Sequence, residues 1–179
     1  MVALFRLCEP DGGSIRIDGV DVSTLGLSTL RSHLSIIPQD PVMFSASLRY
    51  NLDPFNRATD GEVAQVLQRV HLSEAVAGFR DGLQHEISEG GENLSQGQRQ
   101  LVCIARALLR KSKIIILDEA TSSVDAETDA LIQETIRTNF AHATVLTIAH
   151  RLETIVDADR IMLLADGKLA ECEMQCTRR

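Results

Sequence analysis

The sequence has no long apolar run. Its apolar runs, such as the one from Ile114 to Leu117, reach only about four or five residues, far short of the roughly 20 that a membrane-spanning helix requires. The first residues also lack the charged, apolar and small-residue order of a secretion signal. We therefore expect no membrane span in this chain, and we expect the chain alone to be cytosolic.

An excess of positive charge is absent too. The 179 residues include 18 Lys and Arg against 25 Asp and Glu, which gives a formal net charge of -7. A general attraction to the phosphate backbone of nucleic acid needs the opposite sign of charge. We therefore expect no nucleic-acid partner. The length favours one domain with a sizeable core.

Closely paired cysteines are missing as well. The sequence has 4 Cys, at positions 8, 103, 172 and 176, without the short paired spacing of a zinc site. This usage favours free thiols in a reducing compartment. Cys172 and Cys176 form a CxxxC motif that is able to ligate a metal, but we interpret it as part of a terminal tail.

The first part of the chain predicts edge structure. Apolar residues among 2–7 predict a short helix, and Gly12 and Gly13 follow as a turn. Apolar and polar residues alternate over 14–22, as in a half-buried hairpin. The run "LSIIPQD" then predicts a short buried strand that Pro38 ends.

The rest of the chain alternates helix and strand. Helical spacing is present over 59–70, from Ser95 onward and over 126–139, and Ser95 with Gln98 forms a capping box. The last of these helices separates two β-rich runs, "KIIILDEA" and "ATVLTIAH", as in a parallel sheet with crossovers. Two short runs then flank the "DG" of "RIMLLADGKLAE", which is a hairpin signal, and the pattern stops after Glu171. The predicted fold class is α/β.

Asp118 and Glu119 follow the branched apolar residues of "IIILDEA". The carboxyl end of a parallel strand is where open α/β sheets place ligands. One carboxylate can hold Mg²⁺, and its neighbour can orient and deprotonate an attacking water in phosphoryl transfer. The alternative is a strand that ends in solvated acids, and these two residues alone do not decide between the two interpretations.

The helix that begins at Ser95 follows a Gly-rich turn, "SEGGENL". Its first amides and its dipole form a site for an anion such as phosphate, although an ordinary capped helix gives the same pattern. Gln39 and His150 each follow a buried strand, where a polar residue is usually satisfied by its surroundings. Singly, these residues carry little functional information.

Taken together and in order, "PQD", "LSQGQ", "ILDEATSSVD" and "TIAHR" closely resemble the ATP-binding cassette ATPase domain of ABC transporters. The resemblance implies ATP and Mg²⁺ as ligands. It also implies a Q-loop glutamine near Mg²⁺ and the attacking water (Gln39), a signature loop (Ser95, Gln96, Gly97 and Gln98), a Walker B aspartate that holds Mg²⁺ (Asp118), a general base (Glu119), a D-loop aspartate (Asp125) and a switch histidine at the γ-phosphate (His150). By the same resemblance, Ser95 and Gly97 would face the nucleotide of a partner cassette.

Longer segments resemble the second nucleotide-binding domain of the multidrug-resistance-associated group. These are "RSHLSIIPQDPVMFSASLRYNLDPF", "EGGENLS", "GQRQLVCIARALLRKSKI" and "TVLTIAHRLETI". In that group the first domain often carries Asp where this chain has Glu119, so Glu119 favours the hydrolytic second site. The signature reads "LSQGQ" in place of "LSGGQ", a departure that leaves Ser95 and Gly97 available.

A phosphate-binding loop of the form GxxxxGK[ST] occurs nowhere in the sequence. In the family this loop stands just ahead of a helix resembling "VALFRL", and its amides and lysine cradle the phosphates. We therefore expect residues 1–171 to be a partial cassette that begins within that helix, and 172–179 to be an atypical tail. The resemblance implies a P-loop NTPase-type parallel sheet core, incomplete, with an inserted helical subdomain over 55–110 and a small antiparallel edge region.

The first hypothesis for function is the ATP-binding and ATP-hydrolysing domain of an ABC exporter. It would act at the cytosolic face of a membrane, with a second cassette and transmembrane domains as partners, and without a phosphate loop this chain alone is expected to be inactive. The alternative is a non-catalytic fragment that donates its signature loop to a partner's ATP site. A soluble cassette ATPase of the DNA-maintenance kind would carry a long coiled coil between "PQD" and the signature, which this sequence lacks. Transmembrane residues would select the transported substrate, so the sequence does not name it.

Overall fold

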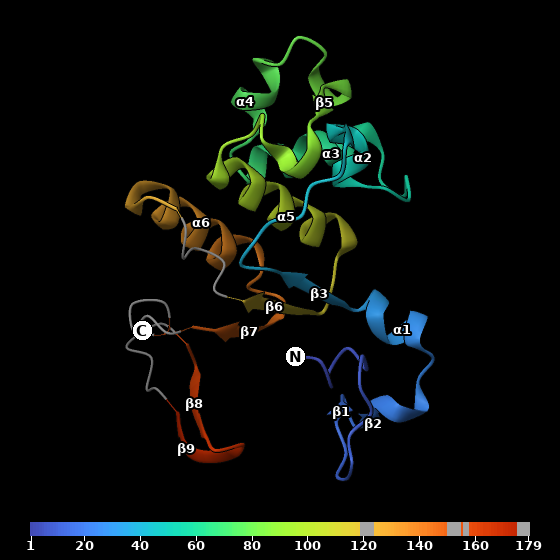
Figure 1. Cartoon of the computed structure of the whole chain (residues 1–179), viewed down its shortest axis with the longest axis vertical. Helices are drawn as coiled ribbons and strands as arrows, with labels where there is room; N and C mark the ends of the chain where they lie inside the picture. Colours follow the sequence, from blue (N-terminus) through green and yellow to red (C-terminus); the bar gives the residue numbers. More distant parts are fainter. Residues whose placement is uncertain (119–123, 150–154, 156–157, 175–179) are drawn as a thin grey trace.

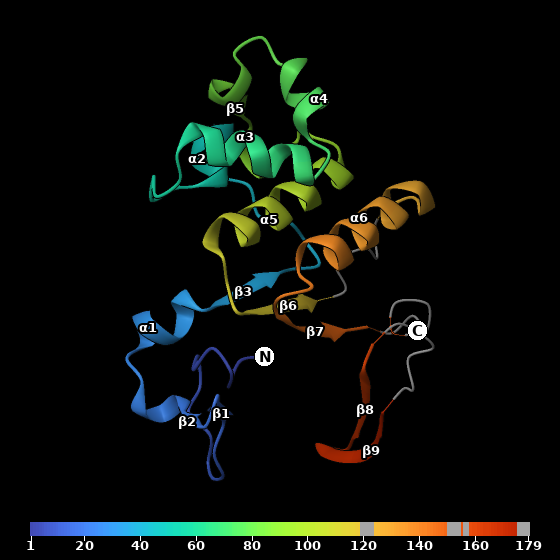
Figure 2. The same ribbon diagram turned by 180° about the vertical axis from the view of Figure 1, so that it is seen from behind.

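Figure 1 shows the architecture of the protein in a computed structural model, which describes residues 1–118, 124–149, 155 and 158–174. A group of short helices forms one end of the molecule, and two hairpins lie at the other end. A parallel sheet occupies the middle, and the two longest helices lie between the sheet and the group of short helices. Figure 2 shows the same order of layers from behind.

The parallel sheet has the strand order β3 (Leu34–Ile37), β6 (Ile114–Asp118) and β7 (Thr144–Ile148). Ile37 pairs with Leu117, and Asp118 pairs with Ile148, so the carboxyl ends of all three strands lie at the same edge of the sheet. Their runs of Ile, Leu and Val are typical of parallel strands. The predicted α/β class and the predicted parallel sheet are confirmed.

The two longest helices, α5 (Gln96–Arg110) and α6 (Ala126–Asn139), cover one face of this sheet (Figures 1 and 2). Ile104 of α5, Ile132 of α6 and Ile115 of β6 are fully buried members of one apolar cluster. Full burial of an Ile side chain is worth roughly 1.5–3 kcal/mol relative to leaving it exposed. These residues therefore anchor both helices on the sheet, and the predicted helices over these residues are confirmed.

The group of short helices contains α2 (Leu48–Leu52), α3 (Asp60–Arg69), α4 (Ser73–Ala77) and a short hairpin of β4 (Ala46–Ser47) with β5 (Glu86–Ile87). Thr59 and Glu62 form a capping box at the start of α3, which confirms the helix predicted there. Val63 and Val66 bury the apolar face of α3 in the same cluster as α5. No helix in the described part of the chain is long and apolar enough to cross a bilayer.

Residues 2–6 form successive turns, so the helix predicted over 2–7 is wrong. Arg6 has φ 48°, a left-handed conformation that a right-handed helix cannot continue. Arg31 donates hydrogen bonds to the carbonyls of Phe5 and Arg6, each at 3.0 Å. The conformation of Arg6 and these tertiary hydrogen bonds therefore hold the segment in turns. Arg31 belongs to α1 (Leu27–Ser32). Short helical turns elsewhere in the described residues are η1 (Val22–Thr24), η2 (Gly82–Gln84) and η3 (Glu89–Gly91).

Two further hairpins pair apart from the parallel sheet, β1 (Arg16–Ile17) with β2 (Val20–Asp21), and β8 (Arg160–Ala165) with β9 (Lys168–Met174). Both are predicted from the sequence. Asp166 and Gly167 have φ 49° and 72°, as the favoured two-residue hairpin turn requires. β9 continues to Met174, past the predicted end at Glu171. Cys172 is an exposed free thiol on β9, and Cys176 lies outside the described residues.

Strand β7 is exposed along its whole length, and no strand in the described ranges pairs with its outer edge. Val145, Leu146 and Ile148 are 36%, 37% and 43% exposed. The β8–β9 hairpin exposes Leu163 and Leu164 in the same way. Exposed apolar residues along an unpaired strand mark a surface that another segment can cover.

Candidate functional site

Two predicted site residues share the carboxyl edge of the parallel sheet. Asp118 is the last residue of β6 and is half-buried, whereas Gln39 is exposed just beyond the end of β3. Because β3 and β6 are parallel neighbours in register, both residues belong to the same edge. Glu119 and His150 lie outside the described residues.

The donor chemistry of this edge fits Mg²⁺. The carboxylate of Asp118 and the amide oxygen of Gln39 are hard oxygen ligands, and protein Mg²⁺ sites often combine one or two carboxylates with substrate phosphates. Among the described residues there is no group of three or more His, Cys, Asp or Glu that could hold a metal ion. Asp118 and Gln39 are therefore residues at this edge that could contribute oxygen ligands to a metal ion.

Ser95 caps α5 as the sequence predicts. Its hydroxyl accepts a hydrogen bond from the amide of Gln98 at 3.1 Å, and the Gln98 side chain accepts one from the amide of Ser95 at 2.9 Å. The Gln96 side chain accepts a hydrogen bond from Arg99 at 2.6 Å. The amides of Gln96 and Gly97 have no acceptor within the described ranges. With the helix dipole, they give the start of α5, beside the exposed Ser95, a positive potential.

Gly97 is buried, and α6 determines its surroundings. A β-carbon at residue 97 would overlap the methyl group of Thr128. Thr128 in turn donates from its amide and its hydroxyl to the carboxylate of Asp125, at 3.0 and 2.7 Å. The starts of α5 and α6 are therefore packed together through Thr128. Any contact of Gly97 with a nucleotide would have to use its backbone.

Asp125 is exposed and caps the start of α6. Hydrogen bonds from the amide and then the hydroxyl of Thr128 lower the pKa of the Asp125 carboxyl from its ordinary value. The positive end of the helix dipole favours the same charged form. Asp125 is therefore ionised and oriented by its own helix, independently of any ligand.

The loop that carries Gln39 is anchored to α5. The side-chain amide of Gln100 donates to the carbonyl of Pro38 at 3.1 Å. Gln100 is 1% exposed, and its side-chain oxygen has no hydrogen-bond partner in the described structure. A buried unpaired acceptor costs about 1–3 kcal/mol, so a polar residue is kept here at a cost in stability. Helix α5 thus connects the Ser95 cap with the residue next to Gln39.

Arg106 of α5 holds the other end of the same loop. Its guanidinium donates to the carbonyl of Val42 at 2.6 Å, and to the carbonyl and side-chain oxygens of Asn51 at 2.5 and 2.9 Å. Asn51 is fully buried. Its amide group donates to three loop carbonyls, those of Phe44, Ala46 and Ser47. The segment 38–51 is therefore fixed at both ends.

Arg106 is a partly buried cation. Burial lowers the pKa of its guanidinium, and burial likewise raises the pKa of the Cys103 thiol that lies beside it. The attraction between the two groups partly offsets both effects. A guanidinium remains protonated throughout the ordinary pH range. The charge of Arg106 is therefore compensated by the neutral oxygens of Val42 and Asn51.

Sequence reasoning missed Asn51, Gln100 and Arg106. Gln100 lies on the same face of α5 as Ile104 and Leu108, and a polar residue in an apolar stripe is a signal of a buried hydrogen bond. Arg106 gives no such signal, because its burial depends on a loop far away in the sequence.

Aromatic side chains beside this loop are exposed. Phe44 and Tyr50 are 49% and 47% exposed and contact each other edge to face, with ring centroids 6.2 Å apart. A cleft of about 540 Å³ is lined by Phe44 and Phe55 together with several arginines. Exposed apolar surface of this kind marks a contact site for another protein segment.

The sequence is similar to those of known proteins. A family model described as "ABC transporter" matches residues 1–122. The chain is 60% identical over 169 residues to the Homo sapiens "ATP-binding cassette sub-family C member 2", covering 94% of this chain and 11% of that protein. It is 58% identical over 170 residues to the Caenorhabditis elegans "Multidrug resistance protein mrp-7", covering 95% of this chain and 11% of that protein.

The fold is shared as well. A solved structure described as "Structure of a bacterial Atm1-family ABC exporter with ATP bound" matches with a TM-score of 0.88 and 37% identity. The match covers 97% of this chain and 30% of that one. The chain thus spans 11% of the length of the two curated relatives described above.

Proposed function

The chain belongs to the ABC transporter family, and from this premise we propose that it is part of an ATP-binding cassette that powers export across a membrane. The cassette would lie at the cytosolic face of the membrane, with transmembrane domains and a second cassette as partners. The exposed cleft at Phe44 and Phe55 offers an apolar surface that either kind of partner could contact.

The carboxyl edge of the sheet would bind ATP together with Mg²⁺. Asp118 and Gln39 would hold the ion, which neutralises charge that develops on the phosphates during transfer. Glu119 would accept a proton from the attacking water, and His150 would contact the γ-phosphate. The roles of Glu119 and His150 rest on the family resemblance, because both lie outside the described residues.

The observation that carries this proposal is the path from Ser95 through α5 to Gln100 and Pro38. Ser95 caps the end of α5 at which the amides of Gln96 and Gly97 have no acceptor in the described structure and would meet the γ-phosphate of a partner's ATP. Gln100 ties the same helix to the carbonyl that precedes Gln39. A partner's nucleotide bound at Ser95 would therefore bias the position of Gln39 in this chain's own site.

A second candidate function is non-catalytic. The sequence contains no GxxxxGK[ST] motif, whose amides and lysine would hold the phosphates. The chain would then donate only its signature loop to a partner's ATP site. Both candidates use Ser95, whereas only the first requires Glu119.

Mixing the chain with an intact first cassette of a C-group transporter and ATP tests the role of Ser95. We expect an ATP-dependent complex in size-exclusion chromatography with light scattering. Ser95→Ala should weaken it about 10- to 150-fold, because a charge-assisted hydrogen bond is worth about 1.5–3 kcal/mol.

Thr59→Ala is the matched control, because Thr59 forms the same kind of capping box at α3. It should leave the complex unchanged. Equal losses in both variants, or no loss in Ser95→Ala, would contradict the proposed contact. If the mixture hydrolyses ATP and Glu119→Gln abolishes that hydrolysis, the result would favour the catalytic candidate. If Glu119→Gln leaves the hydrolysis unchanged, the result would favour the non-catalytic candidate.

A further inference from the structure

A cleft lies at the end of the sheet opposite the proposed nucleotide edge. It has a volume of about 220 Å³ and is lined by residues from the end of α3, the end of α5 and the turn before β7. Two of its lining residues, Ser112 and His142, precede β6 and β7. Asp118 lies at the other end of β6, so this cleft is separate from that site.

Arg69 is fixed in the wall of this cleft. Its Nε donates to the side-chain oxygen of Asn139 at 2.7 Å. Asn139 is 5% exposed and donates to the carbonyl of Thr135 at 2.8 Å, so it is itself held in place. The outer nitrogens of the Arg69 guanidinium have no partner in the described structure. Arg69 is an exposed residue, so these two nitrogens remain available to a ligand in the cleft that it lines.

Lys111 supplies a second cation. Its ammonium lies 3.1 Å from one carboxylate oxygen of Glu62. The other oxygen of Glu62 accepts hydrogen bonds from the amide and hydroxyl of Thr59, at 3.0 and 3.2 Å. Glu62 therefore offsets one positive charge, and both of its oxygens are already engaged.

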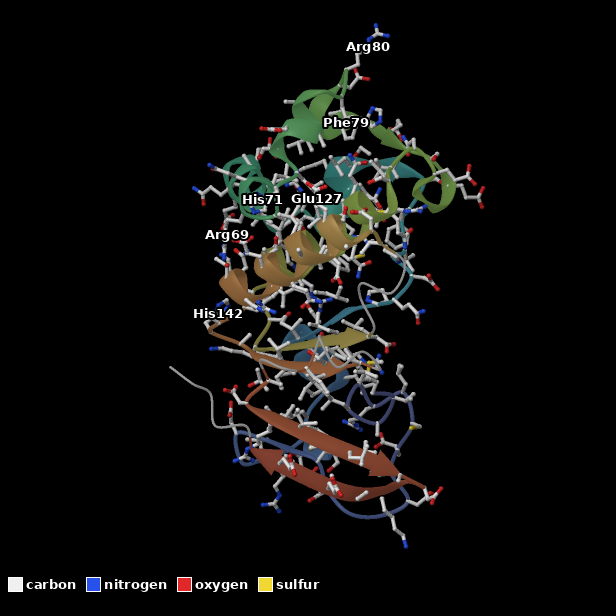
Figure 3. All side chains as sticks on the ribbon, turned by 90° about the vertical axis from the view of Figure 1, so that its left-hand side faces the viewer. Arg69, His71, Phe79, Arg80, Glu127 and His142 are labelled. Carbon is white, nitrogen blue, oxygen red and sulfur yellow. The ribbon has the colours of Figure 1, made fainter. Side chains whose placement is uncertain are left out.

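His142 lines the cleft from the turn before β7. Figure 3 shows Arg69 and His142 on the same side of the molecule, at the end of α3 and beyond the end of α6. His142 is exposed and has no hydrogen-bond or ion-pair partner in the described ranges. Leu108 and Phe140, both buried, supply apolar lining. Arg69, Lys111 and His142, three exposed residues from separate parts of the chain, thus line one small cleft.

We propose that this cleft binds a phosphate group. The fork of Arg69 matches two phosphate oxygens, and Lys111 and His142 add donors beside it. The volume of about 220 Å³ is below the roughly 300–1,000 Å³ of pockets for drug-sized ligands, so the ligand is a single phosphate with few attached atoms. In a chain of net charge -7, this is a local cationic site.

Titration of the isotope-labelled chain with inorganic phosphate, at fixed pH and ionic strength, tests the proposal by NMR. We expect saturable shifts of the amides of Arg69, Lys111 and His142. Arg69→Gln should weaken binding at least about fivefold, because it removes the charged fork but leaves a donor for Asn139. Arg80→Gln is the matched control, because Figure 3 shows Arg80 at the tip of the molecule, and it should change affinity less than about twofold.

Glu62→Gln should act in the opposite direction. Glutamine keeps the capping box with Thr59 but releases Lys111, so phosphate should bind about two- to fivefold more tightly. If Arg69→Gln gives an unfolded spectrum, His142→Gln provides the same test.

Titrations with O-phosphoserine and acetate complete the design. Tighter binding of O-phosphoserine than of inorganic phosphate would support a phosphomonoester as the ligand, and the reverse order would support the free anion. Any one of three results would overturn the proposal. These are shifts that do not saturate with phosphate, an affinity for acetate equal to that for phosphate, and equal effects of Arg69→Gln and Arg80→Gln on phosphate affinity.

Discussion

The α-carbon of Gly97 faces the methyl group of Thr128, with no room for a β-carbon between them. The contact joins the first turn of α5 to the first turn of α6. Gly97 is not among the glycines with positive φ, so close approach and not backbone freedom requires glycine at this position.

Gly97→Ala is expected to destabilise the chain by about 1–3 kcal/mol, because the added methyl group overpacks a buried contact. Urea unfolding followed by circular dichroism measures this change in the free energy of unfolding. Gly26→Ala is a suitable control, because only the side chain of Thr29 lies near a β-carbon there, in ordinary contact.

Thr128→Ser should rescue Gly97→Ala. Serine keeps the hydroxyl that binds Asp125 and removes the methyl group that the new β-carbon would meet. We expect a coupling energy of at least about 0.5 kcal/mol in the double-mutant cycle. Strictly additive effects would show that the two residues do not press on each other.

Arg106→Gln is expected to destabilise the chain by about 2–4 kcal/mol. The change removes hydrogen bonds to Val42 and Asn51 and leaves the oxygens of the buried Asn51 without their charged donor. Chemical denaturation measures the loss. Arg57→Gln is the matched control, because both arginines lie over a phenylalanine ring. The guanidinium carbon of Arg57 is 5.2 Å from the ring centroid of Phe55, and that of Arg106 is 5.7 Å from the ring centroid of Phe44. Similar losses in both variants would assign the effect to ring stacking.

Local sequence patterns predicted the elements but not their tertiary contacts. The capping box of Ser95 with Gln98 and the apolar runs of β6 and β7 involve residues near one another in the chain, so their signals are readable directly. The bond between Arg106 and the Asn51 carbonyl joins residues 55 positions apart. No periodicity reports such a contact.

The beginning of the chain shows the same limit. Its apolar spacing predicts a helix, but Arg31 binds the carbonyls of Phe5 and Arg6, and Arg6 adopts a left-handed conformation. Of the candidate site, the sequence placed Asp118 and Gln39 each after a predicted strand, and the structure shows that the two strand ends share one edge of the sheet. It did not reveal that Gln100 ties the adjacent Pro38 to α5, because that requires the two elements to be seen together.

Acidification should loosen the start of α6 through Asp125. Thr128 lowers the pKa of Asp125 in the folded chain. The ionised carboxylate therefore stabilises the fold in full at a pH above about 3.9, the pKa of an Asp in the unfolded chain. This stabilisation is lost as the pH falls through the lower folded value. Hydrogen exchange of the Thr128 amide measures this acid dependence, and Asp125→Ala should abolish it. Asp125→Asn should keep the helix cap but remove the titrating carboxyl group. An unchanged acid dependence in Asp125→Asn would contradict the assignment.

We expect the chain alone to release no phosphate from ATP above background. Positioning and charge stabilisation supply nearly all of the catalysis in phosphoryl transfer, and the sequence contains no GxxxxGK[ST] loop to hold the phosphates. A phosphate-release assay measures this, with Glu119→Gln as the background. Turnover that Glu119→Gln abolishes would show that the chain positions ATP by other groups.

The outer edge of β7 also constrains how copies of this chain can associate. A parallel neighbour for β7 has to come from a segment reached by a crossover, as β6 and β7 are joined through α6. Two copies related by a twofold axis would instead join their β7 strands in opposite directions and form one mixed sheet. That pairing occupies the β7 edge of both copies at once. Association through this edge would therefore stop at the dimer and not grow into a fibre.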